Sequence, residues 1–92
     1  MKSLISNEKV CWVCGTNQDI HKHHIIRGYA FRKVSEQYGC WVYLCGKHHN
    51  LSNEGVHFNK ELDLTLKRLA QEKFEKAYPE LDFIKVFGRN YL

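Results

Sequence analysis

Two closely spaced pairs of potential metal ligands constrain this chain more than any other feature. The first pair is Cys11 and Cys14, and the second is Cys45 and His48, each with two residues between its members. Two such pairs about thirty residues apart are what a tetrahedral zinc ion takes when two chain segments close over it. Because three thiolates and one imidazole would fill every coordination position, the pattern predicts a structural zinc site.

The chain is short, and a structural zinc site would help to stabilise it. The 92 residues fit one domain, 1–92. A domain near this size buries only somewhat more than roughly 60% of its unfolded surface, so its core is thin. A bound zinc ion would add the stability that this core lacks.

Two alternatives stay open for the cysteines. Cys40 can replace His48 and give a set of four cysteines, although the four-residue gap between Cys40 and Cys45 fits a metal knuckle less well. The cysteines can also be buried small apolar residues, as free cysteines often are. Their paired spacing argues against this second alternative.

The cysteines also bear on location. No apolar signal segment opens the chain, so we expect a cytoplasmic protein. In a reducing cytoplasm disulfides are disfavoured, and closely spaced Cys and His act first as metal ligands. No apolar run reaches the ~20 residues of a membrane span, so we expect no membrane association.

Hydrophobic patterning predicts an α+β domain with a β-hairpin and C-terminal helices. Residues 24–26 and 41–44 are β-branched and aromatic stretches bounded by turn residues. We expect them to be strands that pair as a hairpin, with 28–39 in its loop and Gly39 at the return. Gly15 is available for the positive φ of a tight metal knuckle. The knuckle and the core around the hairpin then occupy about 9–58.

The second part of the chain, about 59–92, should be a helical scaffold. Asn59 is a suitable N-cap for a helix that extends to about Tyr78. One apolar stripe follows this helix at three- and four-residue steps, and its members are Leu62, Leu66, Leu69, Ala70, Phe74 and Ala77. Pro79 should start a second short helix that Gly88 ends. Leu81, Ile84 and Phe87 should share one side of it.

Four histidines remain once the zinc ligands are assigned, namely His23, His24, His49 and His57. They stand in His23-His24-Ile25-Ile26, Leu44-Cys45-Gly-Lys-His48-His49 and Gly55-Val-His57. These motifs resemble those of the HNH, or ββα-metal, nucleases. The chain resembles small phage-encoded HNH nucleases that depend on RecA more closely still, through Tyr38-Gly-Cys-Trp-Val-Tyr-Leu-Cys45 and the ending Phe87-Gly-Arg-Asn-Tyr-Leu92. The resemblance covers nearly the whole chain.

The resemblance implies a zinc-stapled ββα-metal domain with His24 as general base. It also implies that His23, His49 and His57 bind a catalytic divalent metal, which is Mg²⁺, Mn²⁺ or another transition metal. Asn53 competes with His57 as the last ligand. Adjacent strand residues face opposite sides, so His23 can hold the metal while His24 reaches the attacking water. An imidazole with a pKa of about 6.5 is well suited to deprotonate water at neutral pH.

One position departs from the family pattern. The Asn that gives the HNH family its middle letter falls on Cys40 in this chain. Asn50 or Asn53 is a nearby replacement. We expect the remaining histidine, His21, on the surface.

The net charge of +4 is concentrated in the first part of the chain, where residues 1–58 hold seven Lys/Arg against four Asp/Glu. Four cations and no acid lie between residues 20 and 34, and they are Lys22, Arg27, Arg32 and Lys33. They are candidate phosphate contacts. A solvated loop explains them equally well.

Together these features predict a metal-dependent DNA endonuclease or nickase. We expect it to be phage- or prophage-encoded and to act in recombination or DNA processing in the cytoplasm of a bacterial host, with DNA as substrate and a recombinase filament as a candidate partner. The alternative is a non-catalytic zinc-finger module that binds DNA or a protein. A purely structural interaction domain would leave the His23-His24 pair unexplained.

Overall fold

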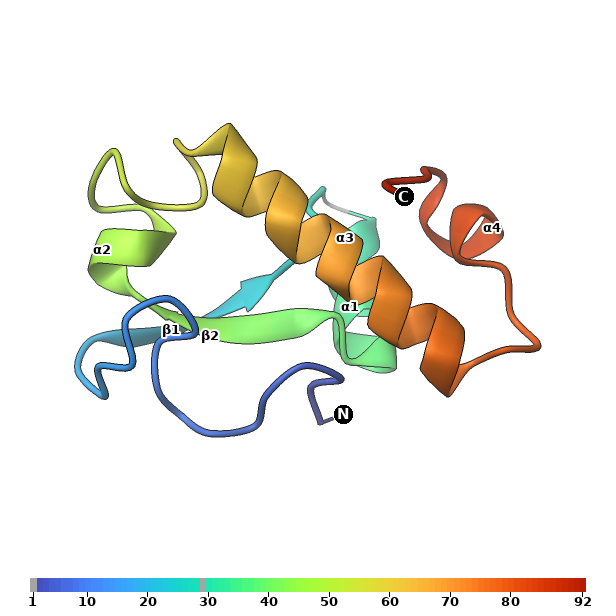
Figure 1. The fold of residues 1–92 in the computed structure, drawn as a ribbon, viewed down its shortest axis with the longest axis horizontal. Coiled ribbons are helices and arrows are strands. Elements are labelled where there is room, and N and C mark those ends of the chain that lie inside the picture. Colours follow the sequence, from blue (N-terminus) through green and yellow to red (C-terminus); the bar gives the residue numbers. More distant parts are fainter. Residues whose placement is uncertain (1, 29) are drawn as a thin grey trace.

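The computed structural model describes residues 2–28 and 30–92. Met1, in the predicted domain, and Tyr29, in the predicted hairpin loop, lie outside the described residues. Along the chain the elements are β1 (Ile20–His24), α1 (Phe31–Tyr38), β2 (Trp41–Cys45), α2 (Gly46–His49), α3 (Lys60–Ala77) and α4 (Phe83–Phe87) (Figure 1). The strands β1 and β2 form an antiparallel sheet. The predicted α+β class, with a hairpin and C-terminal helices, is confirmed.

The hairpin lies partly where the sequence predicts it. β2 is confirmed, but β1 ends at His24, so the predicted strand at 24–26 is wrong. Ile25 and Ile26 are both buried in the core. Successive residues of a strand face opposite sides of the sheet, so the chain must leave the strand after His24 to bury both. As a result β1 pairs over residues 20–24, with Ile20 opposite Cys45 and His24 opposite Trp41.

The connection between the strands contains a helix, so the loop predicted at 28–39 is wrong for residues 31–38. In α1, Phe31, Val34 and Tyr38 recur at three- and four-residue steps and pack against the core. Ser35 is fully buried on the same side, and its hydroxyl donates to the Ile26 carbonyl at 3.0 Å. Gly39 ends the helix at φ 75° and returns the chain toward β2, as predicted.

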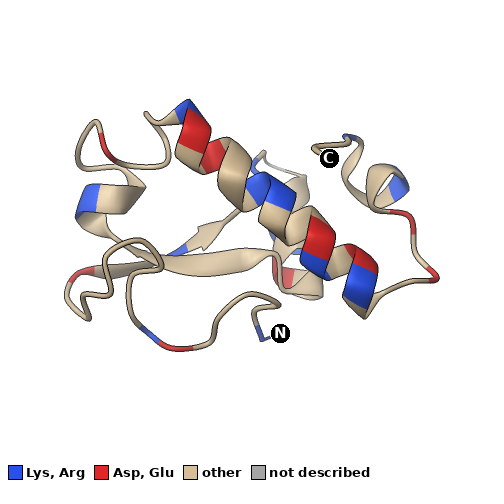
Figure 2. Cartoon of the chain, in the orientation of Figure 1, with Lys and Arg blue, Asp and Glu red and all other residues tan. Residues whose placement is uncertain are grey.

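The long helix α3 lies where it was predicted, but its apolar stripe is buried only in part, because Leu62 and Leu69 are half-buried and Ala77 is exposed. The Asn59 side chain accepts a hydrogen bond from the Leu62 N–H at 3.1 Å, which confirms the N-cap. Leu66, Ala70 and Phe74 are fully buried and share one core with the hairpin. The exposed positions of α3 carry charges of both signs (Figure 2). No helix in the described part of the chain is long and apolar enough to cross a membrane.

The second short helix begins later than predicted. Pro79 lies in a turn, and α4 starts after Asp82, whose carboxylate accepts from the Ile84 N–H at 3.0 Å. Phe83 and Phe87, four residues apart, supply the buried side, whereas Leu81 and Ile84 are exposed. The Asp82 cap and the Phe83–Phe87 pair therefore set the helix, and Pro79 does not. Gly88 ends it at φ 77°, as predicted.

Candidate metal centres

The first cluster of metal-ligating side chains is formed by Cys11, Cys14, Cys45 and His48, here called the Cys/His cluster. Their ligand atoms all lie within 4.8 Å of one another. The Cys14 and Cys45 sulfurs are 3.8 Å apart, and His48 Nδ1 lies 3.7 Å from Cys11 Sγ and 3.3 Å from Cys45 Sγ. Bond lengths of about 2.3 Å to sulfur and 2.1 Å to nitrogen imply tetrahedral edges of roughly 3.5 to 3.8 Å. The cluster can therefore hold a metal ion with little rearrangement.

Two chain segments build this cluster. In the first, a tight turn joins the Gly15 N–H to the Cys11 carbonyl at 2.8 Å, and Gly15 adopts φ 79°, as predicted. The Trp12 N–H then ties the turn to β2 through the Tyr43 carbonyl at 2.9 Å. Burial opposes ionisation of Cys11, but hydrogen bonds from backbone N–H groups lower the pKa of this thiol to about 6. A cysteine that ionises this readily is suited to bind a metal.

Cys40 stands apart from the Cys/His cluster. Its side chain is fully buried in the hydrophobic core, and burial raises its pKa to about 12. It therefore stays a neutral thiol and behaves as a small apolar residue. The alternative in which Cys40 replaces His48 does not match this arrangement.

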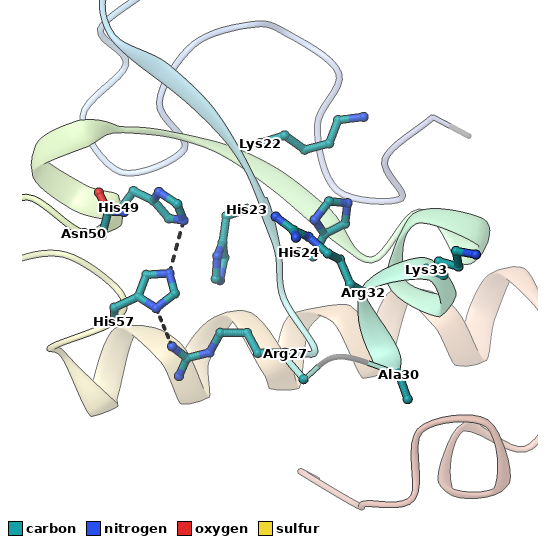
Figure 3. A pocket seen from close by; sticks show the side chains of 11 residues that line it. Lys22, His23, His24, Arg27, Ala30, Arg32, Lys33, His49, Asn50 and His57 are labelled. Atoms are coloured by element: carbon teal, nitrogen blue, oxygen red, sulfur yellow. Dashed lines mark hydrogen bonds between the residues drawn. The ribbon is translucent and has the colours of Figure 1, made fainter.

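The second cluster is formed by His23, His49 and His57, here called the histidine cluster. β1 contributes His23, α2 contributes His49, and the segment between α2 and α3 contributes His57 (Figure 3). Each has a ring nitrogen within 4.8 Å of the other two. His49 Nε2 and His57 Nε2 are 3.2 Å apart. These three nitrogens can hold a second metal ion.

His23 has a buried polar atom without a hydrogen-bond partner among the described residues. The residue is 2% exposed, and the atom is its Nε2. Leaving a buried polar atom unpaired costs about 1–3 kcal/mol. Binding to a metal ion would satisfy this atom.

The electrostatics favour neutral rings. Burial, followed by the charges of neighbouring histidines and of Arg27, lowers the pKa of His23 to about 3 and that of His49 to about 4. Burial and Arg27 also lower the pKa of His57. The lowered pKa values make all three rings neutral at neutral pH, which is the charge state of imidazole that a metal binds.

A basic cavity of about 900 Å³ opens beside the histidine cluster. All four cations singled out in the sequence line it, and they are Lys22, Arg27, Arg32 and Lys33. Their side chains stand around it in Figure 3. His24 and Asn50 line it as well. Asn53, the competing third ligand, is exposed and is not among the described residues that line the cavity.

His24 leaves β1 on the side opposite His23 (Figure 3). The Nε2 atom of His24 lies 3.2 Å from Oε1 of Glu36, which belongs to α1. The Lys22 ammonium lies 3.1 Å from the same oxygen. Although desolvation opposes it, the hydrogen bonds from Lys22 and His24 lower the pKa of Glu36, so this residue is a carboxylate. Glu36 was not singled out from the sequence, because the helix that carries it was expected to be a loop.

Arg27 holds the outer side of the histidine cluster. One of its nitrogens donates to His57 Nδ1 at 2.7 Å, and another lies 3.3 Å from an Asp63 oxygen. Arg27 can only donate. In a neutral ring the proton of His57 is therefore on Nε2, pointing toward His49. For a metal to bind His57 Nε2, this proton would have to move to Nδ1. Arg27 would then lose its acceptor at Nδ1 and would have to move away.

His21 was expected on the surface, but the structure brings it to the histidine cluster. Its Nδ1 is 3.0 Å from His49 Nδ1, and its Nε2 is 3.0 Å from an Asp19 carboxylate oxygen. The side chain is 31% exposed. His21 and His23 are two residues apart on β1, and such residues face the same side of a sheet. This spacing was the signal that could have revealed His21.

Comparisons with protein-family models, with curated proteins and with solved structures find no match to this chain. The case for the two clusters therefore rests on their own side chains. A closed set of four ligands is suited to a structural ion. An open set of three beside a basic cavity is suited to chemistry on an anion.

Proposed function

We propose that this chain is an HNH-type endonuclease that hydrolyses DNA phosphodiester bonds, with a structural zinc ion in the Cys/His cluster and a catalytic divalent metal in the histidine cluster. The observation that carries the proposal is the unpaired, buried Nε2 of His23 between two further neutral imidazoles, next to a basic cavity. The motifs that resemble HNH nucleases supply the same residues. We further propose that it acts in phage recombination or DNA processing in a bacterial host, with a recombinase filament as a candidate guide.

In this proposal His24 is the general base, and Glu36 decides which nitrogen acts. A carboxylate only accepts, so His24 Nε2 donates to Glu36. The neutral ring then has its lone pair on Nδ1, which takes the proton from the attacking water. A divalent ion bound by the three histidines would stabilise charge on the phosphate and on the leaving 3′ oxygen.

The four cations around the cavity would hold the substrate. Arg32 and Lys33 come from α1, and Lys22 and Arg27 from or next to β1. Cations placed around the reacting phosphate anchor the phosphates on either side. Because α3 carries both signs (Figure 2), the cavity face is the better surface for DNA.

A plasmid-nicking assay tests the proposal. The purified protein should nick DNA with Mn²⁺, Co²⁺ or Ni²⁺ at least as well as with Mg²⁺, because imidazole is a borderline ligand and Mg²⁺ prefers oxygen. EDTA should abolish the activity. Protein that binds DNA but never cuts it with any of these metals, on naked or recombinase-coated strands, would instead be a zinc-finger binding module.

A further inference from the structure

We propose that Asp19 and His21 are positioning residues that hold the proton of His49 on Nδ1. The Nε2 atom of His49, on the side of His57, then keeps its lone pair for a metal. The inference deepens the proposed function, because it rests on a metal held by the histidine cluster. Neither residue touches that cluster's centre. They act on it through His49.

The geometry forms a continuous chain of three groups. Asp19 Oδ1 lies 3.0 Å from His21 Nε2, and His21 Nδ1 lies 3.0 Å from His49 Nδ1. The rings of His21 and His49 are edge-to-face, with centroids 5.1 Å apart. Each contact joins polar atoms at hydrogen-bond distance.

The proton positions follow from the end of this chain. The Asp19 carboxylate can only accept, so His21 Nε2 donates to it. A neutral His21 ring then offers a lone pair at Nδ1, which accepts from His49 Nδ1–H. The remaining nitrogen of His49, Nε2, is left with its lone pair. That atom is the one 3.2 Å from His57 Nε2.

His21 is not a fourth ligand of the same ion. It contacts Nδ1 of His49, whereas His57 contacts Nε2 of the same ring. The two nitrogens point to different sides of the ring, so His21 lies behind His49 as seen from the metal position. This is where a carboxylate or carbonyl usually orients a metal-binding histidine. Here a second histidine and a carboxylate together take that place.

The backbone around Asp19 is built to keep the carboxylate there. Asp19 has φ 51°, a conformation that residues other than glycine seldom adopt. Its carbonyl accepts from the Gly46 N–H at 3.0 Å, which ties it to the first residue of α2. A Cβ atom at Gly46 would collide with Asp19 Oδ2. The glycine therefore leaves room for the carboxylate, three residues before His49.

The test measures metal affinity by calorimetric titration of Co²⁺ into protein that already holds one zinc. His21→Leu should lower the affinity by about 10- to 100-fold, the usual cost of losing an outer partner of a metal-binding histidine. His21→Gln should recover much of the loss, since its amide oxygen can accept from His49 and its NH₂ can donate to Asp19. Equal affinity in His21→Leu and the parent would overturn the inference.

A matched control removes a nearby charge without touching this chain of contacts. Glu54 pairs with Lys47 of α2 at 2.9 Å, and both side chains are well exposed. Glu54→Gln should bind Co²⁺ as the parent does. Zinc content and thermal unfolding of every variant should match the parent. If Glu54→Gln weakens binding as much as His21→Leu, the loss of affinity does not depend on the contacts of His21 and the positioning role fails.

A second readout is independent of any metal or DNA. In ¹⁵N NMR spectra, the proton of His49 should be on Nδ1 in the parent, and in His21→Leu the two tautomers should mix. A proton on Nε2 of the parent's His49 would overturn the inference. If metal binding depends on His21 but no DNA is cut, the inference stands and the nuclease proposal fails. If DNA is cut and His21 has no effect on Co²⁺ affinity or on the tautomer, the reverse holds.

Discussion

The Cys/His cluster and the histidine cluster differ in how they are closed, although neighbouring residues of α2 contribute to both. His48 turns to the first and His49 to the second. The first has four ligands, three of them thiols, which would leave a tetrahedral ion no free position. The second has three neutral imidazoles and opens onto a basic cavity. The first arrangement is suited to stabilising the fold, and the second is suited to catalysis. The four-residue helix α2 carries one ligand of each cluster.

The largest effect should come from opening the Cys/His cluster. Cys11→Ser should lose zinc and leave the chain largely unfolded. Structural zinc contributes about 10–16 kcal/mol in small domains, whereas a whole domain is stable by only about 5–15 kcal/mol. Elemental analysis and thermal unfolding followed by circular dichroism measure both effects.

Cys40→Ala is the matched control, because Cys40 is a buried cysteine outside the cluster. It should keep its zinc and lose only the packing of one sulfur atom, on the order of 1 kcal/mol. A Cys11→Ser protein that melts like the parent would show that the cluster does not stabilise the fold.

The next largest effect separates the two clusters at adjacent positions. His48→Ala should lose zinc and most of the stability, as Cys11→Ser does. His49→Ala should keep zinc and fold, but lose the second metal and DNA cleavage. Metal stoichiometry by elemental analysis, paired with a nicking assay, distinguishes the two variants. If both variants lose the same metal, the clusters are not separate sites.

The Cys/His cluster could be predicted from sequence because each half of it is local. Cys11 and Cys14 share a turn, and Cys45 and His48 span the end of β2 and the start of α2. Spacing within such short segments reports geometry directly. The cap of α3 at Asn59 was predictable for the same reason, since its bond reaches only three residues ahead.

The missed features depend on contacts that are distant in sequence or on weak periodicity. α1 has only two turns, and its apolar positions 31, 34 and 38 follow a pair of isoleucines that favoured a strand nearby. Because α1 was not predicted, Glu36 was not identified as the partner of His24. Asp19 acts through a positive φ and through the space left at Gly46, which is 27 residues away. No local sequence pattern predicts this contact between Asp19 and Gly46.

A smaller and more selective effect should follow at His24. His24→Ala should keep both metals and its DNA affinity, yet cut DNA ~10²-fold or more slowly, the scale for a positioned general base. Single-turnover cleavage measures the rate, and equilibrium binding measures the affinity. Glu36→Gln, whose amide oxygen can still accept from His24, should lose less. Unchanged cleavage in His24→Ala, under conditions where EDTA stops the parent, would mean that another group is the base.

Arg27 should give effects of opposite sign on metal and DNA. Arg27→Gln removes the donor that holds the His57 proton on Nε2, together with one nearby positive charge. Co²⁺ should therefore bind ~3-fold more tightly, the scale of one partly screened like charge. DNA binding should weaken, and the slope of log affinity against log salt should fall by about 1. Weaker binding of Co²⁺ would mean that Arg27 supports the metal site and does not compete with it.

The smallest effect on stability at neutral pH should come from His23→Leu, which removes the centre of the histidine cluster. It should abolish binding of the second metal but unfold within ~1 kcal/mol of the parent at pH 7.5, because it replaces an unpaired buried nitrogen with apolar atoms. A loss of several kcal/mol there would show that His23 is a structural core residue.

Acid should separate the His23→Leu variant from the parent. The pKa of about 3 for His23 in the folded protein lies below the value of about 6.5 for a free histidine. The unfolded parent therefore takes up this proton first as pH falls. The stabilising contribution of the neutral ring is complete above pH 6.5 and declines below it. The variant has no such pH-dependent contribution. Between pH 7.5 and pH 5, its free energy of unfolding should therefore rise by about 2 kcal/mol relative to that of the parent. Thermal unfolding of both proteins between pH 5 and 7.5 measures the difference, to which the Cys/His cluster contributes equally. A constant difference across this range would mean that His23 is not the buried neutral imidazole on which the metal site depends.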